Sequence, residues 1–292
     1  MPSTRDIRRR IKSVKNTAQI TKAMQMVAAA KMRKAQQAAL VGRPYAQLLN
    51  EIMAEAAKGT VGFDHPLMQA RPVAKRAVIL VTSDRGLCGG LNSNLFREVV
   101  KFDKNTTIFI TAGKKGAQFI SRTKRTLAAE FNYKDTPEFA EARAISKFVQ
   151  QMFLKGEIDA VDILFPRFVN TLTQQPQVVP FLPIGKLAAA TTGLNAPAQE
   201  LPASASTEVF EFEPDEETVL GGLLPHSLNF QMHQILLETK ASEQSARMVA
   251  MKNATDNAKQ IIKDLTLEYN KLRQANITKE LLEITTAQMA VG

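Results

Sequence analysis

The most conspicuous candidate for chemistry is a glycine-rich loop that runs from Asp84 to Asn92 between an expected strand and an expected helix. The backbone N–H groups of such a loop could bind a phosphate. The loop lacks the Gly-Lys-Ser/Thr ending of a Walker loop and the spacing of Gly-x-Gly-x-x-Gly, and Gly113-Lys114-Lys115-Gly116 also lacks both. A tight turn that needs positive φ explains the loop more simply, and nucleotide binding stays the alternative.

Other reactive side chains stand alone in the sequence. Cys88 would need a nearby base to act as a nucleophile, and the three histidines, His65, His226 and His233, are distant from it in sequence. His226 and His233 lie two helical turns apart, too far to share a metal ion without other ligands. We therefore predict no catalytic residue, no cofactor and no cofactor-binding residue, and no metal ligand.

The positive charge is concentrated at the N-terminus. The net charge is +10, and residues 1–58 hold 12 Lys and Arg against 3 Asp and Glu. An acidic partner should therefore meet this segment. Nucleic acid, an acidic protein surface and plain solvation all remain open, although no aromatic side chain that could stack on bases occurs in the first 44 positions. The cations of the first turns are Arg5, Arg8, Arg9, Arg10, Lys12 and Lys15.

Composition excludes several classes of protein. Hydrophobic residues make up 45% of the chain, which is too many for a disordered protein. No apolar run approaches the 18 residues or more of a membrane span. The single cysteine excludes a disulfide framework within the chain and fits a reducing compartment. The arginines near the N-terminus could suit a transit peptide, but the helical pattern continues past residue 40, so we expect that segment to belong to the folded protein.

Two long stretches contain no Gly or Pro, namely Ser3–Val41 and His226–Val291, and they predict long helices. The N-terminal helix, counted to Lys58, would be about 80 Å long, and the C-terminal helix about 100 Å. Helices of this length do not fit inside a compact globule, so they should pair and project. A kink is expected near Gly42 and Pro44. Steps of three and four indicate a coiled-coil seam at Ile11, Val14, Ala18, Thr21, Gln25, Ala28, Met32, Ala35 and Ala39, and at Met248, Met251, Thr255, Ala258, Ile262, Leu265, Tyr269 and Leu272.

The middle of the chain alternates strand-like and helix-like segments, which favours a small Rossmann-like α/β domain with a largely parallel sheet. The predicted fold class is thus α/β, with a long coiled coil of N- and C-terminal helices. We expect domains at 1–58, 72–217 and 218–292. Lys186–Thr207 should be a connection or a long loop, and Val209–Glu213 an edge strand. The expected strands are Ala77–Thr82, Thr107–Thr111, Val161–Phe168 and Gln177–Phe181, and the expected helices Asn94–Asp103 and Glu138–Leu154.

Three segments resemble the gamma subunits of F-type ATP synthases. They are Arg5–Met32, Ser83–Asn92 and, in the C-terminal helix, Ala241–Met251 with Tyr269–Leu281. They stand in the family's order and extend over essentially the whole chain. One departure lies near the C-terminus, where Thr286-Ala287-Gln288 replaces the usual Ser-Gly-Ala and changes the expected contacts of the helix tip. The cysteine pair that gives chloroplast relatives redox control is absent.

The resemblance implies an antiparallel coiled coil inside a ring of three alpha and three beta subunits, with the α/β domain against the epsilon subunit and the ring of c subunits. The chain would be the rotor that couples proton flow to ATP synthesis and regulates ATPase activity, without a catalytic site of its own and without nucleic acid. It would lie on the cytoplasmic face of a bacterial inner membrane, held there only through the complex. Resemblance to the family also marks candidate contacts: Arg8, Arg9, Lys12, Met24, Phe210, Phe212, Arg273, Gln274 and Thr278.

Overall fold

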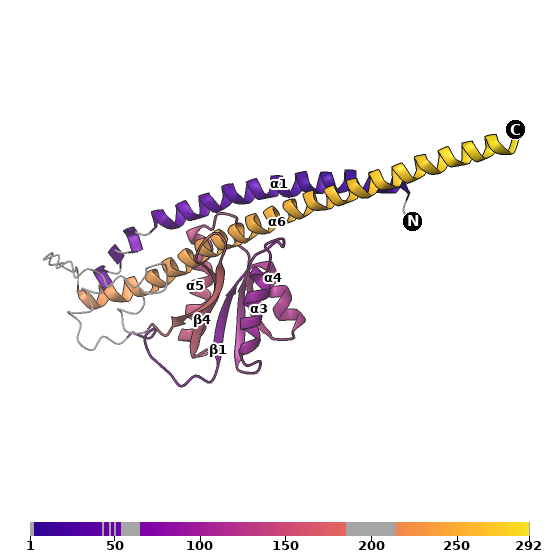
Figure 1. Cartoon of the computed structure of the whole chain (residues 1–292). Helices are drawn as coiled ribbons and strands as arrows, with labels where there is room; N and C mark the ends of the chain where they lie inside the picture. Colours follow the sequence, from indigo (N-terminus) through magenta and orange to yellow (C-terminus); the bar gives the residue numbers. More distant parts are fainter. Residues whose placement is uncertain are drawn as a thin grey trace. The chain divides into compact units, whose positions relative to one another are not determined.

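The computed structural model describes residues 3–42, 44–46, 48–49, 51–53, 65–184, 213 and 215–291. Phe210, Phe212, the Lys186–Thr207 segment and all of Val209–Glu213 except its last residue lie outside these ranges. In chain order the elements are α1, β1, α3, β2, α4, β3, α5, β4, β5 and α6 (Figure 1).

The two terminal helices match the expected long helices. Helix α1 spans Thr4–Val41, and helical residues resume at 44–46, 48–49 and 51–53, so the regular helix ends where Gly42 and Pro44 predict a kink. Helix α6 spans Glu216–Val291 and begins ten residues before the Gly- and Pro-free stretch. It runs through Pro225, which the sequence pattern placed at its boundary.

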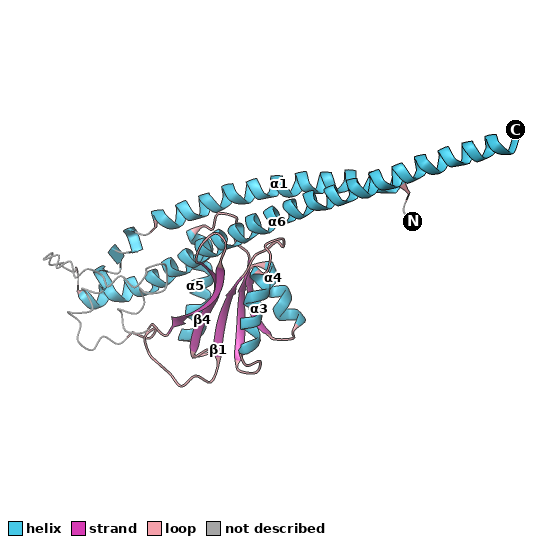
Figure 2. Ribbon diagram, in the orientation of Figure 1, coloured by secondary structure: helices cyan, strands magenta, loops and turns pink. Residues whose placement is uncertain are grey.

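A five-stranded sheet forms the centre of the middle segment, in the order β3-β2-β1-β4-β5 (Figure 2). The pairs β1–β2, β1–β4 and β2–β3 are parallel, and β4–β5 is antiparallel. This confirms the largely parallel sheet. The strands are β1 Arg76–Val81, β2 Thr107–Ala112, β3 Thr126–Phe131, β4 Ala160–Phe168 and β5 Gln174–Leu182, and the helices between them are α3 Leu91–Lys101, α4 Lys114–Arg122 and α5 Phe139–Leu154.

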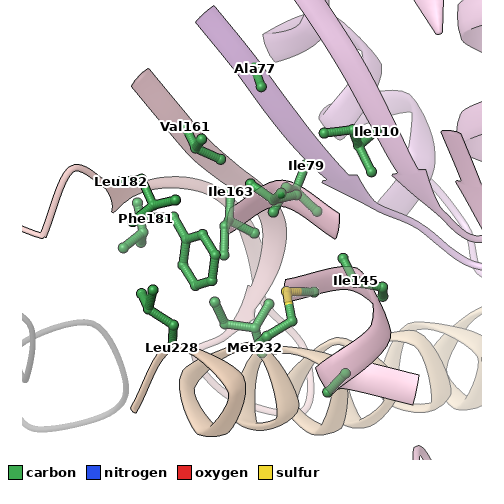
Figure 3. Packing of buried hydrophobic residues seen from close by; sticks show 14 of the residues in the cluster. Ala77, Ile79, Ile110, Ile145, Val161, Ile163, Phe181, Leu182, Leu228 and Met232 are labelled. Carbon is green, nitrogen blue, oxygen red and sulfur yellow. The ribbon is translucent and has the colours of Figure 1, made fainter. Parts of the chain in front are cut away.

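The two faces of the sheet carry separate cores, because successive side chains of a strand point to opposite faces. On one face Ile79 and Ile163 pack with Ile145 of α5 and with Met232 of α6, as Figure 3 shows. On the other face Val78 and Leu80 pack with side chains of α3 and α4, among them Leu95, Val99 and Ile120. The sheet is therefore covered on both sides, as is usual for parallel strands.

The chain divides into two compact units, Met1–Ala28 with Arg247–Gly292, and Ala29–Ala246. Helices α1 and α6 each contribute to both units. The first is called the helix-pair unit below, and the second the sheet unit. The three-part division at residues 58, 72 and 217 stays a prediction.

Candidate functional site: the helix pair and its extension

The predicted seam is confirmed in the helix-pair unit. Every predicted seam position of α1 and α6 in this unit is buried or half-buried, while most of the positions between them are exposed. The hydroxyls of Thr21 and Thr255 lie 2.7 Å apart across the seam, and the guanidinium carbon of Arg8 lies 5.8 Å from the centre of the Tyr269 ring. Lower numbers in α1 meet higher numbers in α6, so the two helices run antiparallel.

The N-terminal end of α1 is closed by its own side chains. The backbone N–H of Asp6 donates to Ser3 Oγ at 3.2 Å, and Ser3 Oγ donates to the carboxylate of Asp6 at 2.7 Å. The hydrogen bond from the Ser3 hydroxyl, followed by one from the Ser3 backbone N–H at 3.3 Å, lowers the pKa of the Asp6 carboxyl. A Ser cap with an acid three residues later is a typical helix start, and it fixes where α1 begins.

Helix α6 continues beyond its pairing with α1. The last half-buried seam residue is Leu272, and all side chains from Arg273 to Met289 are exposed. Tyr269 lies level with Arg8, close to the start of α1 at Thr4, so α1 does not continue alongside the extension. At 1.5 Å per residue, the extension from Arg273 to Met289 is about 25 Å long. Five of its large apolar side chains are strongly exposed, namely Ile277, Leu281, Leu282, Ile284 and Met289.

The predicted contact residues fall into two groups within the helix-pair unit. Arg273, Gln274 and Thr278 lie together at the start of the extension, where the Thr278 hydroxyl donates to the carbonyl of Gln274 at 3.0 Å. The second group is on α1: Arg8, Arg9 and Lys12 are exposed, and Met24 is half-buried next to the seam. Neither group has the arrangement of an acid, a base and a nucleophile that catalysis requires.

The glycine-rich loop forms the tight turn that its sequence predicted. Gly89 has φ +59° and Leu87 has φ +63°. The amide of Asn92 donates to Ser83 Oγ at 2.7 Å, and the buried Cys88 sulfur lies 3.5 Å from the same amide nitrogen. The side chains of the loop therefore hold its own backbone in the turn.

The Gly113–Gly116 motif is explained by packing. A Cβ atom at Gly113, which has φ +108°, would lie 2.2 Å from the carbonyl oxygen of Thr82, and one at Gly116 would lie 2.9 Å from Thr82 Oγ1. The backbone N–H of Gly116 donates to that hydroxyl at 2.8 Å. The two glycines thus allow α4 to begin directly against the end of β1.

The carboxyl edge of the sheet is covered by α6. Open α/β sheets bind their ligands at this edge, where the strand order reverses, which here is between β1 and β4. Glu238 of α6 accepts a hydrogen bond from the N–H of Phe168, the last residue of β4, at 3.0 Å. Lys240 of α6 lies over the ring of Tyr133, whose hydroxyl donates to the carbonyl of Thr82 just beyond β1. Polar residues of α6 therefore lie at this edge of the sheet, and their hydropathy alone does not reveal this position.

The two histidines of α6 make structural contacts in the sheet unit. His226 Nε2 lies 2.7 Å from the hydroxyl of Tyr45, and His233 Nε2 lies 3.2 Å from the carbonyl oxygen of Pro137. Over the described residues, no three His, Cys, Asp or Glu side chains are grouped so that they could hold a metal ion. Over the same residues, no helix is both long and apolar enough to span a membrane.

Comparisons with known proteins agree over the whole chain. The family model described as ATP synthase matches residues 3–291. The ATP synthase gamma chains of Opitutus terrae and Methylacidiphilum infernorum are 49% and 47% identical, with 100% of this chain and 100% of each relative covered. A chain of the Euglena gracilis mitochondrial ATP synthase shares the fold, with a TM-score of 0.67, 19% identity, and 99% and 94% of the two chains covered. The chain belongs to the family of ATP synthase gamma chains.

Proposed function

We propose that this chain is the central-stalk rotor of a proton-translocating F-type ATP synthase. The observation that carries the proposal is the antiparallel pair of α1 and α6, joined at Thr21 and Thr255, with an exposed helical extension from Arg273 to Met289. A helix pair of this kind is a stiff rod. The exposed apolar side chains at its end are suited to contact other subunits that surround it.

The rod would turn inside a ring of three alpha and three beta subunits, driven by the ring of c subunits. A helix pair with one protruding end is asymmetric, so it contacts each of the three beta subunits differently and favours a different conformation in each. Rotation would then couple proton flow to ATP synthesis, and ATP hydrolysis would drive the reverse rotation. The similar Euglena gracilis chain comes from an assembly described with F1 and a c-ring.

The contact residues follow from this arrangement. Arg273, Gln274 and Thr278 are exposed on the extension, where they can form hydrogen bonds with beta subunits. The exposed cations Arg8, Arg9 and Lys12 would face acidic loops of beta subunits, because a long-range attraction without a tight fit suits a surface that slides. Three further contacts are proposed from the family resemblance: Met24 against a beta subunit, and Phe210 and Phe212 at the foot near the c ring.

The chain would itself be non-catalytic, and the ATPase activity would belong to the complex. Among the described residues, neither contact group holds a nucleophile together with a base. The epsilon subunit would be a further partner, at the sheet unit. The complex would place the chain at the cytoplasmic face of a bacterial inner membrane, where it is held through its partners.

Co-purification tests the proposal. The tagged chain is purified from its native membranes, and the ATPase activity of the eluate is measured. We expect alpha and beta subunits in a ratio of three to three to one with this chain, together with active hydrolysis. Recovery of the chain alone would contradict the proposal, and recovery with nucleic acid in a salt-dependent complex would favour a basic coiled-coil protein instead.

A further inference from the structure

A run of polar residues in α6, Glu238–Ser245, is buried on every side of the helix. We call this run the polar collar. Apart from Ala241, all of its residues are polar or charged, and each of the eight is at most 5% exposed. Helices that pack through one apolar stripe leave the other side in water, so burial all round a polar run is unusual. Within the described part of the chain, the hydroxyls of Thr239 and Ser242 have no hydrogen-bond partner, so the contacts that hold the collar come from its other polar residues.

One grip on the collar comes from the hairpin that joins β4 and β5. The carboxylate of Glu238 accepts the N–H of Phe168 at 3.0 Å, and the hydroxyl of Ser245 donates to the carbonyl of Thr171 at 2.7 Å. The amide of Gln174 also donates to the Ser245 hydroxyl, at 3.5 Å. Phe168, Thr171 and Gln174 of the hairpin thus form hydrogen bonds with Glu238 and Ser245 of α6.

A second grip comes from the segment after β3. The contact is made by the ammonium of Lys240, which lies 4.4 Å from the centre of the Tyr133 ring. Glu243, whose carboxylate lies 3.1 Å from the same ammonium, belongs to α6 itself and positions the lysine. The hydroxyl of Tyr133 is itself fixed, because it donates to the carbonyl of Thr82 at 2.9 Å. Burial, and then the nearby charge of Glu243, raise the pKa of Tyr133 well above its ordinary value, so the phenol keeps its proton as a donor.

The two grips hold opposite faces of the helix. At about 100° per residue, the mean direction of Glu238 and Ser245 differs from that of Lys240 by about 150°. Contacts on one face would let the helix roll against the sheet. Contacts on two opposite faces resist rotation about the helix axis in both directions.

Interdigitated apolar packing also resists rotation, but it is less selective about its partners. Below the collar, Leu228, Met232 and Ile235 hold α6 against the sheet, and the hydrophobic effect that stabilises this contact is non-directional. Hydrogen bonds and buried ion pairs require particular partners at particular distances, and they can fix one register of a helix. The polar contacts of the collar thus add directional restraints to those that His233 makes with Pro137 and Asn229 with Gln150, nearer the start of α6.

From this geometry we infer that the polar collar is the torsional lock between the five-stranded sheet and α6, with Glu238, Lys240, Glu243 and Ser245 as positioning residues. The inference rests on the proposed rotor function. Torque that enters at the sheet unit would pass through the collar into the helix, which continues without a break to Val291. Loss of one grip would leave the fold intact and make the rotor softer in torsion.

The test replaces the ion pair by apolar side chains of similar size, Lys240→Met with Glu243→Leu. Replacement of a buried ion pair by apolar side chains of similar volume is often neutral for stability, and the loss of the ammonium here removes the cation–π contact with Tyr133. A rod is attached to the assembled complex through Ser121→Cys, an exposed position of α4, and the alpha and beta subunits are fixed to a surface. The measured quantity is the angular variance of the rod in the nucleotide-stalled state. Removal of one of two comparable restraints should raise that variance about twofold.

The control is Lys101→Met with Glu98→Leu, an ion pair with the same spacing whose lysine is exposed on α3. It should leave the variance at the wild-type value. An unchanged variance in the collar variant, or an equal rise in the control, would overturn the lock. If the collar variant does not assemble, Ser245→Ala is measured instead, and a variance equal to that of wild type would overturn the lock as well. A wild-type complex in which ATP never turns the rod would contradict the rotor function itself.

Discussion

The hydroxyl oxygens of Thr21 and Thr255 lie 2.7 Å apart, although 234 positions separate these residues in the sequence. Thr255 also lies within hydrogen-bond distance of the carbonyl of Met251, at 2.8 Å, and Thr21 of the carbonyl of Ala18, at 3.1 Å. Each hydroxyl has one proton, so the two protons are shared between the contact of the two hydroxyls and the backbone carbonyls of Met251 and Ala18. A polar pair in the seam fixes the axial register of α1 against α6, as buried polar groups do in coiled coils.

The first prediction concerns this pair. Thr21→Val and Thr255→Val should each destabilise the chain by about 1 kcal/mol, because each leaves the other hydroxyl with fewer partners. The double variant should lose less than the sum of the two, with a coupling energy of about 0.5 kcal/mol or more. Denaturant unfolding of the four proteins measures the cycle. Thr17→Val is the control, since its hydroxyl is exposed and bonds only within α1. Strict additivity would contradict a direct contact.

The second prediction concerns Gly113, where the backbone has φ +108°. Gly113→Ala should lower the free energy of unfolding by about 2 kcal/mol or more, because a Cβ atom would collide with the carbonyl oxygen of Thr82 in a backbone conformation that alanine rarely adopts. Gly86→Ala should change it by less than about 0.5 kcal/mol, because nothing lies within 4 Å of the added atom. Equal midpoints of urea unfolding for the two variants would rule out this explanation of the motif.

The coiled-coil seam could be predicted from the sequence because its periodicity is a direct consequence of helix geometry. Positions such as Ala18, Thr255 and Ala258 are not strongly hydrophobic, but they keep the steps of three and four, and they are buried or half-buried. Strands β1, β2 and β4 could be predicted for a related reason, since runs of β-branched and apolar residues between turns are typical of buried strands.

Two elements were missed because their residues do not carry that signal. Strand β3, Thr126–Phe131, lies at the sheet edge with alternating exposure, and its Ala128, Ala129 and Glu130 are poor indicators of a strand. Helix α4, Lys114–Arg122, has a glycine in its first turn. In a sequence such a glycine indicates a loop, and only the structure shows that it allows a close approach to Thr82.

The polar collar could not be found by hydropathy. Residues Glu238, Lys240 and Glu243 read as a solvated helix face, because polar side chains are mostly exposed. Their burial depends on partners that lie far away in the sequence, namely Phe168, Thr171 and Tyr133. A local pattern contains no information on such partners, so this part of the molecule becomes visible only in the folded structure.

The third prediction concerns pH. The hydrogen bond from Lys31, 2.5 Å from Asp135, lowers the pKa of Asp135 below its ordinary value of 3.8. The depressed pKa means that the contact stabilises the fold fully above pH 3.8, and that this contribution is lost as the pH falls through the lower folded pKa. The pair is exposed, so its contribution should be only about 0.5 kcal/mol.

NMR titration of the side-chain carboxyl carbons measures this effect. In Lys31→Gln the pKa of Asp135 should rise. The pKa of Asp159 serves as the internal control, since it is lowered by the backbone N–H groups of Lys75 and Ala74 and should not move. A titration of Asp135 that is the same in both proteins would show that Lys31 is not its partner in solution.

The fourth prediction concerns the extension of α6. Arg273→Ala combined with Gln274→Ala should leave the stability of the isolated chain within about 0.5 kcal/mol, because both side chains are exposed. In the complex the same change should reduce ATP synthesis per proton transported, since contacts with the beta subunits are lost. Lys271→Ala, exposed just before Leu272, is the control and should retain coupling. Unchanged ATP synthesis in the double variant would remove these two residues from the contact surface.

Rotation of the chain against its partners tests the account most directly. The rod attached through Ser121→Cys is followed while the fixed complex hydrolyses ATP. We predict net rotation in one direction, with three pauses in each turn, one for each beta subunit. Active hydrolysis with a rod that only fluctuates about one angle would contradict the rotor function.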